Sequence, residues 1–171
     1  GVAGAAVSPR FEQGIVRPED LARPSAALRV VGARDAAVGA QVARRGLAAY
    51  TPEFDVIRYV PDLPYMLEVG GGLVKHLHSG PAMVAAIVNA AGVVTAVHQT
   101  WIDLGQPKGK LKIAYDGAPL PAKKVVGSKK GGAIRLRRSQ GDRTIVMGEG
   151  IETTATALVS GAYAQAAFWA G

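Results

Sequence analysis

The chain has 171 residues, 49% of them hydrophobic and 19% charged, so it can bury a core and does not have the composition of a disordered chain. It has no cysteine, which excludes disulfides and thiolate metal sites and fits a reducing, cytoplasmic compartment. No apolar run reaches the roughly 20 residues that a membrane-spanning helix needs, so we expect no membrane partner.

The first part of the chain predicts an arm and two short helices. Residues 1–34 are expected to form an N-terminal arm and a first helix, for which Ser25 is a suitable N-cap. A second helix is expected over residues 35–45, with Val38 and Val42 on one face, so that the two helices form a hairpin. The chain begins with Gly rather than Met, so we expect a processed or excised piece.

The middle of the chain predicts an antiparallel sheet. Residues 56–60 indicate a short strand that Pro61 ends, and GGG at residues 70–72 indicates a loop. The stretch PAMVAAIVNAAGVVTAVHQTWI, residues 81–102, predicts two strands joined by a tight turn at Asn89–Gly92. Residues 103–131 are rich in Gly, Pro and Lys, which predicts a long loop with one short strand near residues 111–115.

The last part of the chain predicts a parallel unit. Residues 133–136 and 144–147 indicate strands, residues 150–160 a helix, and AAFWA at 166–170 a buried strand. The order strand, tight turn, helix, strand is typical of a parallel β-α-β unit. We therefore predict an α/β fold with three parts: the arm and first helix (1–34), the helical hairpin with antiparallel sheet and basic loop (35–143), and a partial parallel unit (144–171).

The net charge of +7 is concentrated in one segment. Residues 105–143 carry eleven Lys or Arg against Asp116 and Asp142, whereas the charges of residues 1–104 sum to zero. Such a basic segment attracts polyanions, of which nucleic acid is the commonest, although a solvated loop that aids solubility is the alternative. The candidate phosphate-binding residues are Lys123, Lys124, Lys129, Lys130, Arg135, Arg137 and Arg138.

The stretch IVMGEGIETTATALVSG, residues 145–161, places Glu149 and Glu152 where an apolar strand turns into a helix. The helix dipole stabilises an acidic residue in the first turn by roughly 0.3–1 kcal/mol, which alone would account for both residues. Gly148 and Gly150 flank Glu149, however, and would let the backbone bend and a ligand approach. Carboxylates also suit Mg²⁺ that shares its sites with substrate phosphates, so a metal site with Glu149 and Glu152 as ligands remains open.

Several stretches together resemble a known family. GEGIETTATAL resembles the first motif of the Toprim domain in plasmid and phage primases and helicase-primases. PAMVAAIVNAAGVVTAVHQTWIDL and KKVVGSKKGGAIRL resemble the domain that precedes Toprim in those proteins, and AAFWAG resembles a strand of Toprim. The ordered series covers about residues 35–171 and is more specific than any one of its motifs.

The resemblance implies a fragment of a DNA primase or helicase-primase that acts in DNA replication. Glu149 would serve nucleotidyl transfer as a general acid/base or through Mg²⁺, together with an Asp-x-Asp pair that this sequence lacks, so the fragment alone is expected to be inactive. DNA or RNA and nucleotides would be its partners, with a helicase partner or a helicase domain in the parent chain. The alternative is a non-enzymatic nucleic-acid-binding or assembly module with a Toprim-like fold. A Toprim nuclease or topoisomerase relative is a weaker third possibility.

Other candidate residues each allow two interpretations. His76 and His78 would share a face of a strand as metal ligands, or form a solvent-facing pair, which we favour. For His98 we favour a structural hydrogen-bonding role over nucleic-acid contact, and for Trp101 a core or edge position over base stacking. GSKKGG at residues 127–132 resembles a phosphate-cradling turn but lacks the spacing of a P-loop.

Overall fold

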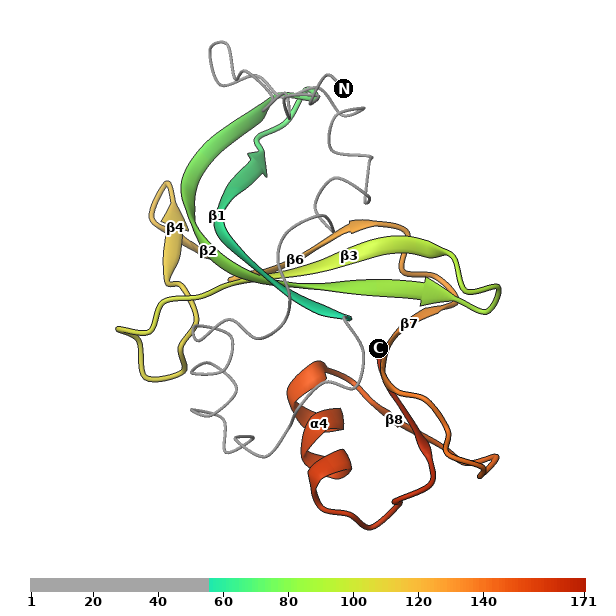
Figure 1. Ribbon diagram of the computed structural model, residues 1–171. Helices are drawn as coiled ribbons and strands as arrows, with labels where there is room; N and C mark the ends of the chain where they lie inside the picture. The colour runs from blue at the N-terminus through green and yellow to red at the C-terminus, as the bar shows by residue number, and fades with distance from the viewer. Residues whose placement is uncertain (1–55) are drawn as a thin grey trace, which may run out of the picture.

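The computed structural model describes residues 56–171, and the helices expected within residues 1–55 lie outside the described residues. The described residues form a mixed α/β fold, mostly sheet with one helix (Figure 1). The elements are β1 (Ile57–Glu68), β2 (Val74–Asn89), β3 (Val94–Trp101), β4 (Ile113–Tyr115), β5 (Ala118–Leu120), β6 (Lys123–Gly127), β7 (Gly132–Arg137), β8 (Ile145–Gly148), α4 (Ile151–Val159) and β9 (Ala167–Ala170).

The strand β2 is the centre of the sheet. It pairs antiparallel with β3, which pairs in turn with β6. It also pairs with β1 along most of its length and with β7 at Val88 and Asn89. The strand order is β6-β3-β2-β7-β9-β8, with β1 beside β2, and β4 and β5 form a separate hairpin. The strands β8 and β9 pair with each other in parallel, whereas β9 pairs antiparallel with β7. The predicted parallel pair therefore lies at one edge of an otherwise antiparallel sheet.

Two predictions for the antiparallel part are wrong. Pro61 does not end the first strand, because β1 continues to Glu68. Pro61 lies in a register irregularity between Val60 and Leu63, so the N–H that proline lacks is not needed for a regular strand-to-strand hydrogen bond. Residues 103–131 hold β4, β5 and β6 rather than one short strand. The Asp116-Gly117 pair explains the extra hairpin, since both residues have positive φ, as a tight hairpin turn requires.

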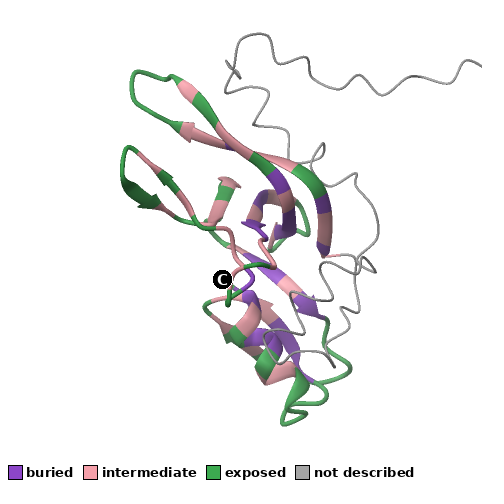
Figure 2. Cartoon of the chain, turned by 90° about the vertical axis from the view of Figure 1, so that its left-hand side faces the viewer, coloured by how far each residue is buried: buried purple, intermediate pink, exposed green. Residues whose placement is uncertain are grey.

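The helix α4 packs on one face of the sheet and completes its largest core. Ile151 and Ala155 of α4 belong to the same buried cluster as Ile134, Leu136 and Phe168 from the strands β7 and β9. Figure 2 shows buried residues along the middle of the strands and in the helix, whereas the ends of the hairpins are exposed. The first turn of α4 is thereby fixed against the sheet.

The opposite face of the sheet holds a smaller aromatic core. Trp101 is 1% exposed and donates a hydrogen bond from Nε1 to the carbonyl oxygen of Leu63 at 2.9 Å. The hydroxyl of Tyr65 donates to the carbonyl oxygen of Pro121 at 3.0 Å, and the rings of Tyr65 and Trp101 lie 4.6 Å apart between centroids. Trp101 is therefore a core residue, as favoured from the sequence.

The end of β6 gives a direct test of the packing. Gly127 has φ +98°, and a Cβ at this position would come within 2.4 Å of the carbonyl oxygen of Thr95. We expect Gly127→Ala to lower the free energy of unfolding by about 3 kcal/mol, since the positive φ and the backbone overlap each cost about 1–2 kcal/mol. Urea denaturation measures the change.

Gly131→Ala is the matched control. Gly131 has φ +68°, but a Cβ there would meet no atom within 4 Å. This variant should show only the conformational cost of about 1 kcal/mol. Equal losses in the two variants would contradict the close approach of β6 to β3.

Candidate phosphate and nucleic-acid interface

The strand β8 brings Glu149 to the junction between the sheet and α4. β8 ends at Gly148, and α4 begins after Gly150, an N-cap residue with extended backbone. A Cβ on Gly148 would come within 2.4 Å of the Thr154 hydroxyl, so the end of the strand and the first turns of the helix are in close contact. Glu149 lies between them, exposed, and among residues 56–171 no hydrogen bond or ion pair holds its carboxylate. The side chain is therefore not locked in the interior.

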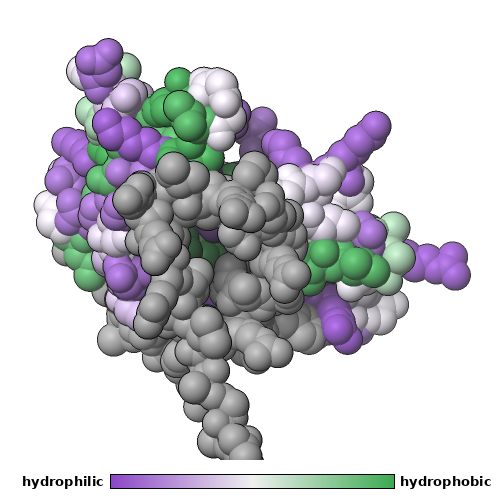
Figure 3. Space-filling model, turned by 90° about the horizontal axis from the view of Figure 1, so that it is seen from above, coloured by the Kyte–Doolittle hydropathy of each residue, from purple (hydrophilic) through white to green (hydrophobic). Residues whose placement is uncertain are grey.

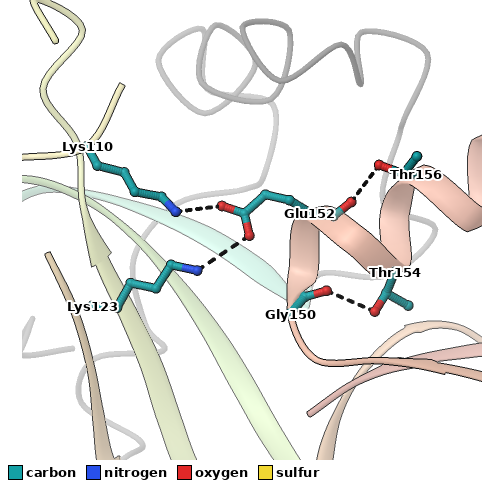
Figure 4. Close-up of polar contacts among 6 residues, drawn as sticks. All are labelled: Lys110, Lys123, Gly150, Glu152, Thr154 and Thr156. Carbon is teal, nitrogen blue, oxygen red and sulfur yellow. Dashed lines mark hydrogen bonds and ion pairs between the residues drawn. The ribbon is translucent and has the colours of Figure 1, made fainter. Parts of the chain in front are cut away.

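Glu152 connects the helix to the antiparallel part of the sheet. Its carboxylate oxygens lie 3.1 Å from Lys110 Nζ and 3.5 Å from Lys123 Nζ (Figure 4). Lys110 comes from the loop after β3, and Lys123 begins β6. The side chains of Glu152 and Lys110 are about one-quarter exposed, at 24% and 23%, so the pair is partly shielded from water. Three segments that are distant in sequence thus meet at one carboxylate.

The two lysines determine the protonation of Glu152. Burial by itself would raise the pKa of Glu152, but the hydrogen bond from Lys110 and the positive charges of Lys123 and Lys110 outweigh it and lower the pKa from 4.5 to about 2. The backbone N–H of Glu152 itself also contributes a hydrogen bond to the ionised form. The carboxylate is therefore charged throughout the neutral range.

This ion pair predicts a specific pH dependence of stability. Because the folded-state pKa of Glu152 is depressed, its contribution is complete above about pH 4.5 and is lost as the pH falls toward 2. We expect wild type to exceed Glu152→Gln in free energy of unfolding by about 1–2 kcal/mol at pH 7, allowing for solvent screening. Urea denaturation of both proteins between pH 2.5 and 7 measures the difference, and a difference that does not change with pH would contradict the ion pair.

Two polar side chains of β3 lie on the same face as Lys123. His98 and Thr100 are two residues apart on β3, so their side chains lie on the same face of the strand. Thr100 is the register partner of Lys123 on β6. Thr100 is 0% exposed, and neither its Oγ1 nor His98 Nδ1 has a hydrogen-bond partner among the described residues. Burial lowers the pKa of His98, and the charges of Lys123, Lys110 and Lys129 lower it further against the opposite effect of Glu152. The imidazole is thus neutral at pH 7.

The seven basic residues predicted to bind phosphate fall into two groups. Lys129 and Lys130 are exposed in the turn between β6 and β7. The Gly132 N–H closes this turn by donating a hydrogen bond to the Lys129 carbonyl oxygen at 3.0 Å. Arg138 is exposed directly after β7, and Lys123 belongs to the Glu152 ion pair. Hydrophilic side chains extend from the periphery of the described residues in the view from above (Figure 3).

The other three basic residues donate hydrogen bonds to backbone carbonyl oxygens. Lys124 donates to the carbonyl oxygen of Met66 and lies 4.2 Å from the centroid of the Tyr65 ring, and burial lowers its pKa. Arg135 donates to the carbonyl oxygen of Asn89 and lies 5.1 Å from the Trp169 ring centroid. We therefore leave these two residues, and Arg137, out of the exposed basic surface.

Arg137 is the most deeply buried of the set, at 8% exposed. Its Nη2 donates to the carbonyl oxygens of Tyr163 and Ala166 at 2.8 and 3.0 Å, and its Nε donates to Ala166 at 3.2 Å. The guanidinium also lies 4.6 Å from the centroid of the Phe168 ring. Arg137 thus holds the segment between α4 and β9 against β7.

The remaining sequence candidates do not converge on a metal site. His76 is exposed and its Nε2 lies 2.8 Å from the hydroxyl of Ser79, while His78 is half-buried beside Gly80. Within residues 56–171 no three His, Asp or Glu side chains gather as they would around a metal ion. Lys110, which the sequence did not single out, contacts Glu152 more closely than Lys123 does. Its position in the basic segment is the one signal that could have indicated it.

Comparison with protein families adds one finding. A family model described as a domain of unknown function, DUF7146, matches residues 25–136, which is more than half of the chain. The chain belongs to the DUF7146 family. No curated protein and no solved structure matches it.

The DUF7146 match includes His98, Lys110 and Lys123 and ends within β7, before Glu149 and Glu152. The two lysines that hold Glu152 therefore belong to the matched domain, and the carboxylate that they hold lies beyond it. Among residues 56–171 no helix has the length and apolar character needed to cross a membrane.

Proposed function

We propose that this chain is a part of a plasmid- or phage-type DNA primase or helicase-primase in which Glu149 serves nucleotidyl transfer. The observation that carries the proposal is the position of Glu149, an exposed carboxylate at the carboxyl end of β8 in a parallel strand–helix–strand unit. Ligands of open α/β sheets bind at the carboxyl ends of the strands. The resemblance of residues 144–171 to the first half of a Toprim domain supports the same interpretation.

Glu149 would act as the general acid/base of the transfer. A correctly placed group of this kind accelerates proton transfer by about 10²–10⁴-fold. Mg²⁺ would stabilise the attacking and leaving oxygens when bound. The described residues do not by themselves fit this ion, because both oxygens of Glu152 face lysines and Glu149 is a single carboxylate. Further carboxylates would have to come from outside residues 56–171.

The exposed basic residues would hold the nucleic acid. Lys129 and Lys130 lie in the β6–β7 turn, which adjoins the β2–β3 hairpin because Gly132 pairs with Asn89 and Ser128 N–H donates to the Thr95 carbonyl oxygen. Exposed lysines release counterions when they contact phosphates, so binding should weaken steeply with salt. This surface therefore predicts affinity for nucleic acid without base specificity.

The binding part of the proposal is tested with single-stranded DNA and the 171-residue chain. We expect the logarithm of the association constant to fall linearly with the logarithm of salt concentration, and Lys129→Gln to reduce the slope by about 0.7. Lys75→Gln, at the opposite end of β2, is the control and should leave the slope unchanged. Fluorescence anisotropy between roughly 50 and 200 mM salt measures both. Affinity that does not change over this range would remove the basic surface from the proposal.

The second candidate function is a nucleic-acid-binding or assembly module without catalytic activity. The observation in its favour is that both oxygens of Glu152 are paired with lysines, which leaves Glu149 without a neighbouring carboxylate for a metal ion within residues 56–171. Primer synthesis by a longer protein that contains this chain, compared between wild type and Glu149→Gln, separates the two functions. Equal activity would favour the module.

A further inference from the structure

The cluster around Glu152 has the composition of an anion site that already contains an anion. Two lysine ammonium groups converge on one carboxylate, and Lys129 adds a third positive charge close enough to affect His98. We infer that Glu152 is an internal anion that occupies a phosphate subsite formed by Lys110, Lys123 and the β3 side chains His98 and Thr100, and that a nucleotide phosphate displaces it. The inference rests on the proposed function, because that function supplies the phosphate-bearing ligand.

Both lysines are fixed relative to β3. Lys123 is the register partner of Thr100, and Lys110 forms a β-bridge with Ile102, two residues further along the chain. The adjacent backbone is held by the hydrogen bond from Leu111 N–H to the Trp101 carbonyl oxygen at 3.1 Å. The two ammonium groups therefore start from neighbouring backbone positions and would remain close together if the carboxylate left.

Two polar atoms on the same face of β3 have no hydrogen-bond partner within residues 56–171. The hydroxyl of Thr100 is fully buried and the Nδ1 atom of His98 is buried, and neither is hydrogen-bonded among the described residues. A buried polar atom without a partner typically costs about 1–3 kcal/mol. A hydroxyl and a neutral imidazole can each donate a hydrogen bond to a phosphate oxygen. The Glu152 carboxylate, which reaches in from α4, accepts no hydrogen bond from either of these two atoms.

The carboxylate itself can leave without disrupting the helix. Glu152 lies in the first turn of α4, and the helix start is held by other contacts, namely Thr154 N–H and Oγ1 to the Gly150 carbonyl oxygen at 3.0 and 2.9 Å. Its side chain is 24% exposed, so it has a route to solvent. A phosphate group offers more negative charge and more acceptor oxygens than one carboxylate, and it would meet the same two lysines.

Tripolyphosphate tests the subsite in the 171-residue chain, because it carries the phosphates of a nucleotide without base or sugar. In wild type the Glu152 carboxylate leaves the site open in only a fraction of the molecules, and the apparent affinity for phosphate is reduced by that fraction. Removing this carboxylate should therefore raise the apparent affinity. We expect Glu152→Gln to bind tripolyphosphate about fivefold more tightly than wild type by calorimetry. Glu68→Gln, an exposed carboxylate at the end of β1, makes the same change in net charge and should alter affinity less than about twofold.

The lysines are tested in the Glu152→Gln background. Lys110→Gln and Lys123→Gln should each weaken binding about fivefold, whereas Lys108→Gln, an exposed lysine two residues from Lys110, should have an effect of less than about twofold. Tripolyphosphate should also shift the His98 imidazole resonance in NMR spectra and leave those of His76 and His78 in place. A purely structural role of Glu152 would produce no such shift.

Three results would overturn the inference: equal affinities of Glu152→Gln and Glu68→Gln, equal losses for Lys108→Gln and Lys110→Gln, or no saturable binding by any variant. Tripolyphosphate is neither template nor primer, so these results do not depend on nucleic-acid binding or on Glu149. Failure of the primase proposal would instead appear as unchanged primer synthesis by Glu149→Gln.

Discussion

Replacing Arg137 with Met is expected to lower the free energy of unfolding by about 3 kcal/mol. The guanidinium donates three hydrogen bonds to the carbonyl oxygens of Tyr163 and Ala166, and Ala166 is 0% exposed. Met fills a similar volume but donates nothing, so the carbonyl oxygen of the buried Ala166 would lose both guanidinium donors, at a cost of about 1–3 kcal/mol, whereas the carbonyl oxygen of Tyr163 would keep the hydrogen bond from the Ala166 N–H. The contact between the guanidinium and the Phe168 ring would also be lost.

Arg143→Met is the control for this prediction. Arg143 lies between β7 and β8 and is exposed, so its replacement should change the free energy of unfolding by no more than about 0.5 kcal/mol. Urea denaturation of wild type and both variants gives the comparison. If the two variants lost equal stability, Arg137 would be acting as a surface charge, as the sequence alone suggested, and the structural role would be contradicted.

Local sequence signals predicted the elements that depend on neighbouring residues. The hairpin of β2 and β3 follows from two apolar runs around the turn at Asn89–Gly92, and the β8–α4–β9 order follows from an apolar run, a glycine-flanked turn and a helical period. The β4–β5 hairpin was missed although Asp116-Gly117 is a favourable turn pair, because its strands are short and only half-buried. The predicted end of the first strand came too early, because the sequence does not reveal the register irregularity that accommodates Pro61 within β1.

The candidate site was predictable only where it is local. Glu149 could be placed because strand, turn and helix are consecutive in the chain. The contacts of Glu152 with Lys110 and Lys123 could not, because the loop after β3, the start of β6 and α4 meet only in the folded protein. Arg137 was misleading for a related reason: the irregularity between Arg135 and Arg137 changes which partner on β9 each residue faces, and no local pattern reports it.

Replacing Glu149 with Gln is expected to have the largest effect on function. The amide keeps the size and hydrogen-bonding capacity of the side chain but can neither accept a proton nor carry a charge. If Glu149 is the general acid/base, the rate of nucleotidyl transfer by a longer protein that contains this chain should fall about 10²–10⁴-fold. Affinity for template should change little, since the exposed lysines of the β6–β7 turn supply that contact.

The Glu149 comparison needs a control that changes an equivalent carboxylate elsewhere. Glu68→Gln removes an exposed carboxylate from the end of β1, in the part of the sheet that pairs with the start of β2. This variant should retain the wild-type transfer rate within about twofold, because an exposed charge away from the β8–α4 junction is largely screened. Equal losses in both variants would point to a general effect of charge on nucleic-acid binding.

The most direct test of a catalytic role for Glu149 is the single-turnover rate of primer synthesis with saturating template, nucleotides and Mg²⁺. Under these conditions differences in binding do not contribute, so the rate reports the transfer step itself. We predict a rate for Glu149→Gln about 10²–10⁴-fold below that of wild type, with Glu68→Gln unchanged. A Glu149→Gln rate equal to that of wild type would contradict nucleotidyl transfer at this junction.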